Sequence, residues 1–323
     1  MAVTLAQAAV LSETELQRGV IEIFIQESAL LDRIPFLDIE GNAYAYDIEG
    51  TLPNIEFRGV NEAYQESTGT VNQLSEALCI LGGDADVDRF IQQTRSNVND
   101  QRATQTKLKV KAMSFKFNDH FFNGDISVQP KGFDGLKKRL LGTQVIDAGP
   151  NGLPIVGNGG NDIHDFFDQL DALIASVDGE VDALYMNKAI RARIMSAGRR
   201  AGGTDWVNQL FNTGGSEPLR KDMVPTYNGI PMLNPGKNLL KEDILPMTET
   251  VGTSTDTGSI YAVRFGEDEV DQAVTALTNG RVMVDDLGEL QEKPAMRTRV
   301  ELYGGLAVFG GKAAARLRGV RAR

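Results

Sequence analysis

The chain has 323 residues, of which 41% are hydrophobic and 24% charged, and this composition is typical of a globular protein with one or two cores. Its formal charge of -11 disfavours tight binding to nucleic acid, because the phosphate backbone would be repelled. The lone cysteine, Cys79, excludes an internal disulfide and fits a reducing cytoplasm. No apolar run approaches the roughly 20 residues of a bilayer span, and the first residues lack the basic start of a secretory signal, so we expect no membrane contact.

The charge is unevenly distributed along the chain. Residues 1–83 hold thirteen acidic and three basic residues, whereas the remainder is nearly neutral. After Glu301 there are five basic residues and no acidic ones. The N-terminal quarter is therefore the acidic part of the molecule.

The N-terminal segment has a helical pattern. Apolar residues recur at three- and four-residue intervals between Thr14 and Leu31, and Pro35 ends the pattern. We therefore expect an amphipathic helix in an N-terminal arm.

Two strands joined by a long connection follow the arm. Residues 43–48 alternate, with Tyr44 and Tyr46 on one side, and residues 70–81 are suited to a return strand. The connection of about twenty residues is longer than an ordinary hairpin loop. A two-stranded excursion with little core of its own is marginal in water, so it predicts a partner surface on another subunit.

The next segment is predicted to be one long helix. Residues 99–122 lack Gly and Pro, and their apolar side chains follow a helical stripe, although Lys107 to Ala112 also alternate as a strand would. The length favours the helix, and its phenylalanines are interpreted as core. A turn and a short helix at 133–140 come next. The predicted elements beyond the glycine-rich linker at 142–160 are helices at 162–176 and 187–197 and strands at 183–186, 229–233, 261–265, 281–284 and 296–303.

The residues that could support catalysis are few. The two histidines, His120 and His164, begin no H-E-x-x-H pattern, and Asp162, Asp165 and Asp168 do not have the spacing of a calcium loop. The helical periodicity around them favours a solvated acidic helix face. We predict no catalytic residues, no bound metal and no cofactor.

A glycine-rich stretch before this helix invites a nucleotide-binding interpretation. Gly157, Gly159 and Gly160 follow a short apolar run, but Asp162 stands where G-x-G-x-x-G needs its third glycine. A turn into the helix is the preferred interpretation.

Several segments together have a familiar order and spacing. They are the acidic excursion at 40–81, FFNGD at 121–125, FDGLKKRL at 133–140, DALYMNKAIRARI at 182–194, NGIPMLNPG at 228–236, YAVRFGEDEV at 261–270 and VELYGGLAVFGGKAAARL at 300–317. In this succession the chain resembles the major capsid protein of tailed bacteriophages, which has the Hong Kong 97-like fold.

The resemblance implies an α+β fold and assigns a part to each segment. Residues 1–36 would be the N-terminal arm and 37–81 the extended loop that lies over a neighbouring subunit. Residues 82–150 and 266–323 would form the peripheral domain, with the helix at 99–122 as its spine. Residues 151–265 would form the axial domain around the five-fold and six-fold axes.

The resemblance also implies a structural function without enzymatic activity. The chain would assemble with itself into hexamers and pentamers of an icosahedral shell that encloses double-stranded DNA in the virion. Assembly would take place in the bacterial host cytoplasm. Further expected partners are a separate scaffolding protein, a portal and, as a candidate, a decoration protein, with only non-specific contact to packaged DNA.

The extended loop supplies the candidate inter-subunit residues. An acidic loop can pair with basic residues of its neighbour, and such pairs mainly set register and specificity. The candidate contact residues are Tyr44, Tyr46, Glu49, Glu56, Arg58, Glu62 and Glu66, and their candidate basic partners are Arg281, Arg297 and Arg299.

Two features depart from the family pattern. Only about 35 residues precede the loop, which argues against a built-in scaffolding segment and for a separate scaffolding protein. Self-crosslinking members join a lysine to an asparagine, but residues 36–81 contain no lysine, so no crosslink from this loop is expected.

Two rival functions remain open. An encapsulin-like nanocompartment shares the fold and encloses enzyme cargo instead of DNA. An oligomeric metal-dependent α+β enzyme would use Asp162, His164 and Asp165 as its site.

Overall fold

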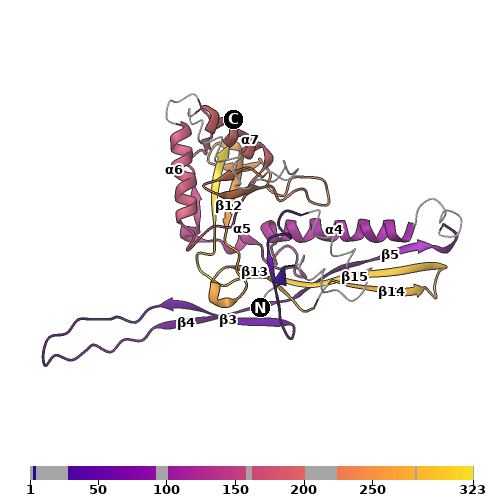
Figure 1. The fold of residues 1–323 in the computed structure, drawn as a ribbon, viewed down its shortest axis with the longest axis horizontal. Coiled ribbons are helices and arrows are strands. Elements are labelled where there is room, and N and C mark those ends of the chain that lie inside the picture. The colour runs from indigo at the N-terminus through magenta and orange to yellow at the C-terminus, as the bar shows by residue number, and fades with distance from the viewer. Residues whose placement is uncertain are drawn as a thin grey trace, which may run out of the picture.

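The computed structural model describes residues 3–4, 28–91, 101–157, 162–200, 224–280 and 282–322. It contains two sheets, each covered by helices, and a separate two-stranded ribbon that projects from the body of the molecule (Figure 1). The mixed helix and sheet content confirms the predicted α+β class.

The first sheet is organised around one long strand, β15 (Ala295–Val308). This strand pairs with β5 over residues 295–304, with β14 over 296–301 and with β13 over 304–308. The other strands of the sheet are β1 (Val3–Thr4), β2 (Pro35–Asp38), β5 (Cys79–Asp88), β13 (Val274–Thr278) and β14 (Met283–Glu289).

A long helix, α4 (Gln101–Asn123), covers this sheet (Figure 1). Its side chains Val110, Met113 and Phe117 are buried in one core with Leu302 and Leu306 of β15. The helical stripe seen in the sequence is therefore the core-facing side of the helix, and the prediction of one long helix is confirmed.

The second sheet has the order β6-β16-β12-β8-β10-β9, with β11 beside β12 and β7 beside β16. Side chains alternate across it: Leu184 and Ile260 face one core and Tyr185 and Tyr261 the other. Its strands are β6 (Val145–Asp147), β7 (Leu153–Pro154), β8 (Ala183–Tyr185), β9 (Thr226–Tyr227), β10 (Ile230–Leu233), β11 (Glu249–Val251), β12 (Ser254–Val263) and β16 (Ala314–Arg321).

Two helices pack on one face of the second sheet. They are α6 (Asp162–Ala175) and α7 (Lys188–Arg200), whose buried side chains join the core of Leu184 and Ile260. The opposite face rests on Phe122 at the end of α4, whose ring lies 5.3 Å from those of Tyr185 and Tyr261. The end of α4 thus joins the two sheets into one body.

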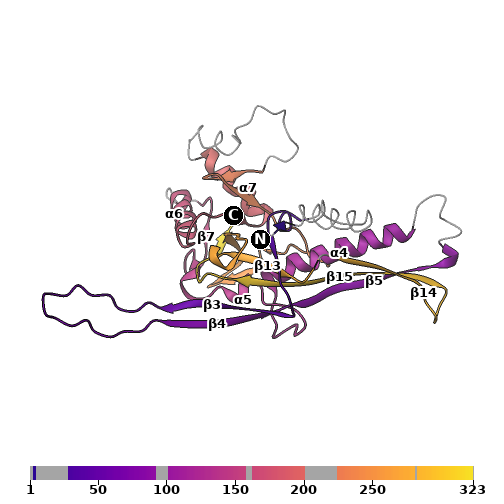
Figure 2. The same cartoon turned by 60° about the horizontal axis from the view of Figure 1, so that its bottom comes forward.

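The ribbon consists of β3 (Ala43–Thr51) and β4 (Thr70–Ala77), paired antiparallel from Ala43 with Ala77 to Thr51 with Thr70. Both views show it reaching away from the two sheets (Figures 1 and 2). A single residue, Leu78, separates β4 from β5, so the ribbon leads directly into the first sheet. The remaining elements are the short helix α5 (Leu136–Arg139) and the 3-10 turns η1 (Gly142–Gln144) and η2 (Glu269–Asp271).

Most predicted elements have counterparts, with three differences. The predicted return strand at 70–81 continues to residue 88, as β4 and then β5. The predicted arm helix between Thr14 and Leu31 lies outside the described residues except for its last four, which form a turn with Leu30 and Leu31 buried.

The third difference concerns the C-terminal strand. The predicted peripheral domain included all of 266–323, but β16 pairs with β12 over seven positions and belongs to the second sheet. The chain turns after Phe309 through Gly310 and Gly311 and crosses from one sheet to the other. β6, at 145–147, also joins the second sheet, beside β16. The boundary between the parts built on the two sheets is therefore set by strand pairing, which the sequence resemblance could not locate.

A ladder of ion pairs joins β5 to β15. Asp84 stands opposite Arg299 and Asp86 opposite Arg297 in the strand register. Both pairs are bidentate, with Nε–Oδ1 distances of 2.8 Å for Arg299–Asp84 and 2.6 Å for Arg297–Asp86. Lys293 Nζ adds a contact of 2.6 Å to Asp86 Oδ2. The hydrogen bonds from these cations hold the pKa values of Asp84 and Asp86 below the usual aspartate value.

This ladder predicts an acid-labile first sheet. Because both carboxyl pKa values are lowered by folding, their contribution to stability is complete above the usual value of 3.8 and is lost only as the pH falls through the lower folded values. Thermal unfolding should therefore change little between pH 7 and 5 on account of these groups and drop below pH 3.8. The Asp84→Asn/Asp86→Asn variant should have a lower melting temperature than the unmodified chain at pH 7. Its melting temperature should also fall less when the pH is lowered further. An unchanged acid profile in this variant would contradict the assignment.

Candidate functional site

The outer part of the ribbon, residues 52–69, is the tip, and all its side chains are exposed. Several of them are large and apolar: Phe57 is fully exposed, and Val60 is 93% exposed. The other exposed apolar side chains of the tip are Leu52, Ile55 and Tyr64. So many large exposed apolar side chains on one short segment make the tip a candidate contact site.

Local bonds give the tip a defined shape without a core. The backbone N–H of Gly59 donates to Glu62 Oε2 at 2.8 Å, and Arg58 Nη1 donates to the Glu62 carbonyl at 3.0 Å. The Arg58 guanidinium also lies 5.2 Å from the centroid of the Tyr64 ring. Asn61 has a φ of 70°, which permits the turn between them.

The base of the ribbon, called here the root, is anchored by aromatic rings. The Phe309 ring lies 5.0 Å from that of Tyr46 and 5.9 Å from that of Tyr44, both edge-on. Tyr46 is only 2% exposed, and its hydroxyl donates to the Val308 carbonyl at 3.3 Å. Burial, together with the Glu76 carboxylate, raises the pKa of Tyr46 to about 12, so the ring stays neutral and packed.

A partly buried ion pair fixes the second strand of the root. Arg139 binds the Glu76 carboxylate with both terminal nitrogens, at 2.7 Å for Nη2–Oε2, and its Nε donates to the Asp134 carbonyl. Burial alone would lower the pKa of Arg139, but the hydrogen bond to Glu76 raises it above its usual value. The charged pair is therefore maintained, and it ties β4 to α5.

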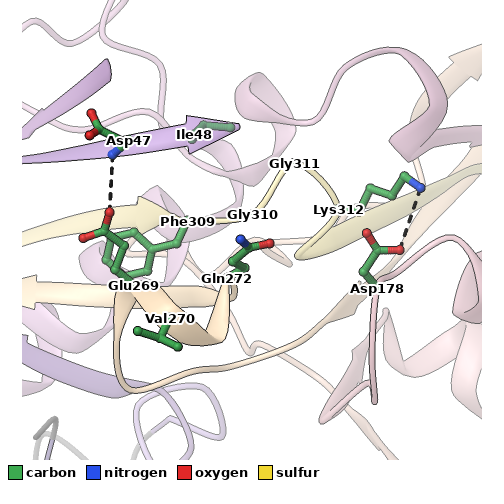
Figure 3. A pocket seen from close by; sticks show the side chains of 10 residues that line it. All are labelled: Asp47, Ile48, Asp178, Glu269, Val270, Gln272, Phe309, Gly310, Gly311 and Lys312. Carbon is green, nitrogen blue, oxygen red and sulfur yellow. Dashed lines mark hydrogen bonds and ion pairs between the residues drawn. The ribbon is translucent and has the colours of Figure 1, made fainter. Parts of the chain in front are cut away.

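Glu269 holds the first strand from η2. Its Oε2 accepts a hydrogen bond from the Tyr44 hydroxyl at 3.2 Å and its Oε1 accepts one from the Asp47 backbone N–H at 3.3 Å. A pocket of about 510 Å³ opens beside this contact, with Asp178 and Lys312 on its far side (Figure 3). The root is thus contacted from η2, from α5 and from the end of β15.

Comparisons with known proteins agree with this architecture. Residues 13–161 match the family model of major capsid protein GP7. The SrpI encapsulin of Synechococcus elongatus superposes with a TM-score of 0.62 at 18% identity, covering 91% of this chain and 87% of that one. The capsid protein of a native GTA particle superposes with a TM-score of 0.62 at 14% identity, covering 91% of this chain and 90% of that one. A structure from Mycobacterium phage Bobi superposes with a TM-score of 0.57 at 14% identity, covering 90% of this chain and 89% of that one. No curated protein matches the sequence.

This chain has the Hong Kong 97-like fold. The structural matches establish that fold, and the family model covers the N-terminal part of the chain, a little under half of its length. The fold implied by the sequence resemblance is confirmed.

The predicted contact residues fall into two groups. Glu56, Arg58, Glu62 and Glu66 lie in the exposed tip. Tyr44 and Tyr46 lie at the root instead, where they contact Phe309 of their own chain. The side chain of Glu49 lies outside the described part of the structure.

Two of the three predicted basic partners are already paired within the subunit. Arg297 and Arg299 bind Asp86 and Asp84, and Arg281 lies outside the described residues. Their pairing with a neighbour's loop stays a prediction. Sequence analysis missed Glu76, Arg139, Glu269 and Phe309, because no local pattern indicates contacts across 30 to 265 residues.

The predicted acidic face of the helix at 162–176 lies on the surface. His164, Asp165 and Asp168 are exposed on α6. Within the described ranges no group of three or more His, Cys, Asp or Glu side chains is arranged to hold a metal ion. Among the helices there, none is long and apolar enough to cross a bilayer.

The root predicts a stability change that is specific to one pair. The Arg139 and Glu76 side chains are 16% and 18% exposed, so Arg139→Gln should cost about 2 kcal/mol, somewhat below the loss for a fully buried pair. Because each single change leaves the other partner uncompensated, Glu76→Gln/Arg139→Gln should cost less than the sum of the two. Urea unfolding of the three variants measures this coupling. Additive losses would show that the pair does not fix the root.

Proposed function

We propose that this chain is the major capsid protein of a tailed bacteriophage, forming hexamers and pentamers of an icosahedral shell around double-stranded DNA. The observation that carries the proposal is the ribbon, which is held firmly at its root and leaves every side chain of its tip exposed. A two-stranded ribbon of this kind is marginal in water without a covering surface. The fold leaves that surface to another copy.

The electrostatics of the chain suit this function. A formal charge of -11 keeps the wall from binding packaged DNA tightly, so DNA contacts are non-specific. Acidic residues of the tip, Glu56, Glu62 and Glu66, would meet basic side chains of the neighbouring subunit and set the register of the ring.

The wider assembly follows from the same proposal. A separate scaffolding protein directs the curvature of the shell in the bacterial host cytoplasm, and a portal occupies one vertex. A decoration protein is a further candidate partner. Residues 82–144 and most of 266–313 act as the peripheral domain, and the second sheet, which includes β6, acts as the axial domain.

An encapsulin-like nanocompartment is the second candidate. It is favoured by the SrpI encapsulin match, whose TM-score equals that of the GTA capsid protein. The family match to a major capsid protein favours the phage shell. Purified particles that contain protein cargo and no DNA would decide for the encapsulin, and portal and terminase genes beside this one would decide for the phage.

Shortening the ribbon tests the shell function. Replacing residues 52–69 by a two-residue Asn-Gly turn should leave the free energy of unfolding within about 0.5 kcal/mol, because the tip packs on nothing in its own chain. The same variant should form no closed shells, with or without a scaffolding protein, in light scattering and negative-stain microscopy.

A matched control keeps the tip. Asn61→Gly preserves the turn, whose φ is positive, and removes no apolar side chain. It should assemble like the unmodified chain. Shells from the shortened variant in normal yield would contradict the role of the ribbon, and a stable monomer from the unmodified chain under all conditions would contradict the proposed function.

The ribbon also predicts the chemistry of the mature shell. Residues 36–81 contain no lysine, so the ribbon cannot supply the amine of a lysine–asparagine crosslink. Denaturing gels of mature particles should show a single band at 35.1 kDa. A ladder of covalent oligomers that maps to the ribbon would contradict this expectation.

A further inference from the structure

The two helices on the second sheet carry opposite and strictly segregated charge. α6 contains four aspartates and no lysine or arginine, and α7 contains one lysine, four arginines and no acid. Both helices bury one apolar stripe in the same core, so their charged residues stand on the outer sides. Each subunit therefore carries one acidic and one basic helix surface.

Four of these charged side chains form no ion pair within the described part of the chain. Asp165, Asp168, Arg199 and Arg200 are exposed, and none of them forms an ion pair there. On the same helix as the two arginines, the buried Nε of Arg193 has no hydrogen-bond partner among the described residues.

The strands beneath the helices are different. Arg316 pairs with Glu249, Arg318 with Asp147 and Arg321 with Asp256, so the arginines of β16 are neutralised inside the subunit. The second sheet thus balances its own charge, whereas its two helices do not. An unbalanced pair of surfaces of opposite sign is suited to a contact between subunits.

The helices lie on different parts of the sheet. α6 packs on β16 and β7, at one end of the strand order, whereas Arg191 of α7 donates to the Met232 carbonyl of β10, near the other end. In Figure 1, α6 and the projecting ribbon lie on the same side of the molecule, with α7 farther toward the side of α4.

A closed ring of identical subunits needs two different surfaces on each subunit, because each copy meets one neighbour with each side. In such a ring, the neighbour on the side of α6 and the ribbon would present its other side, which carries α7, to α6.

We propose that α6 of one subunit docks against α7 of the next subunit in the ring, with Asp165 and Asp168 facing Arg199 and Arg200. This proposal rests on the proposed shell function. It identifies the two helix surfaces that set the direction of the ring. The partner is a second copy of this chain, because only a copy supplies the complementary helix at the matching side.

Charge reversal of each helix tests the contact. Arg199→Glu/Arg200→Glu makes the contact positions acidic on both helices, and Asp165→Lys/Asp168→Lys makes them basic on both. In either variant alone, like charges meet at every contact, and the concentration needed for assembly should rise about ten-fold or more. Sedimentation velocity and negative-stain microscopy measure this change. Unchanged assembly of both variants would overturn the proposal.

Mixing the two variants separates the contact from any folding defect. In an equimolar mixture each acidic subunit meets basic neighbours on both sides, so rings should form again, with the two subunits alternating. An alternating ring closes only with an even number of subunits, so native mass spectrometry should find six-membered rings with three copies of each and no five-membered rings. A chain that carries both reversals should assemble by itself. Absence of rescue in both experiments would overturn the proposal.

Two controls complete the test. Lys131→Glu/Lys137→Glu reverses two exposed cations on the segment that precedes η1, and this variant should assemble like the unmodified chain. If reversal of α7 leaves shells intact but empties them of DNA, α7 is a nucleic-acid contact and the proposal is overturned. If the unmodified chain forms shells and the variants do too, only the helix contact fails. If the unmodified chain forms none, the shell function itself fails.

Discussion

A two-stranded ribbon has no second layer with which to cover its own side chains, and the organisation of this molecule depends on that constraint. The tip can be useful only if its direction is fixed, because a contact at the far end of a loose ribbon would lose its free energy to conformational entropy. The root supplies that direction. Tyr46 and Phe309 lock the first strand by packing, and the Arg139–Glu76 pair locks the second by charge. The packed root therefore fixes the direction in which the exposed tip projects.

The root transmits its position into the first sheet through the backbone. β4 continues into β5 after one residue, and β5 runs beside β15 over ten positions. The bidentate pairs from Asp84 and Asp86 to Arg299 and Arg297 lie on that ladder and hold the two strands in one register. A one-residue slip would reverse the faces of every side chain of β5 and separate all these pairs. The orientation of the ribbon is therefore fixed by the same interactions that build the sheet.

Periodicity predicted the long helix, both helices of the second sheet and the strands of the ribbon, because those patterns are local and long enough to be unambiguous. It could not place β16, whose sheet depends on a pairing with β12 more than fifty residues earlier. It could not separate Tyr44 and Tyr46 from the tip either. An alternating pattern shows that two tyrosines share a face, but whether that face meets a neighbour or Phe309 is decided 260 residues later in the chain. The internal pairing of Arg297 and Arg299 was likewise hidden, since Asp84 and Asp86 face them only in the folded register.

The charged side chains fall into those paired within the subunit and those exposed to contact another subunit. The arginines of β15 and β16 have carboxylate partners across a strand, where short distance and fixed geometry make each pair self-sufficient. The charge of these arginines is already neutralised within the subunit, so they contribute little to a contact with another subunit. Exposed charges without an ion pair in the described residues include Asp165 and Asp168 on α6 and Arg199 and Arg200 on α7. Because a ring is closed by unlike surfaces, opposite signs on two helices would give the proposed ring its direction. In that ring the ribbon would reach the same neighbour that the acidic helix faces, so that one contact would orient the other.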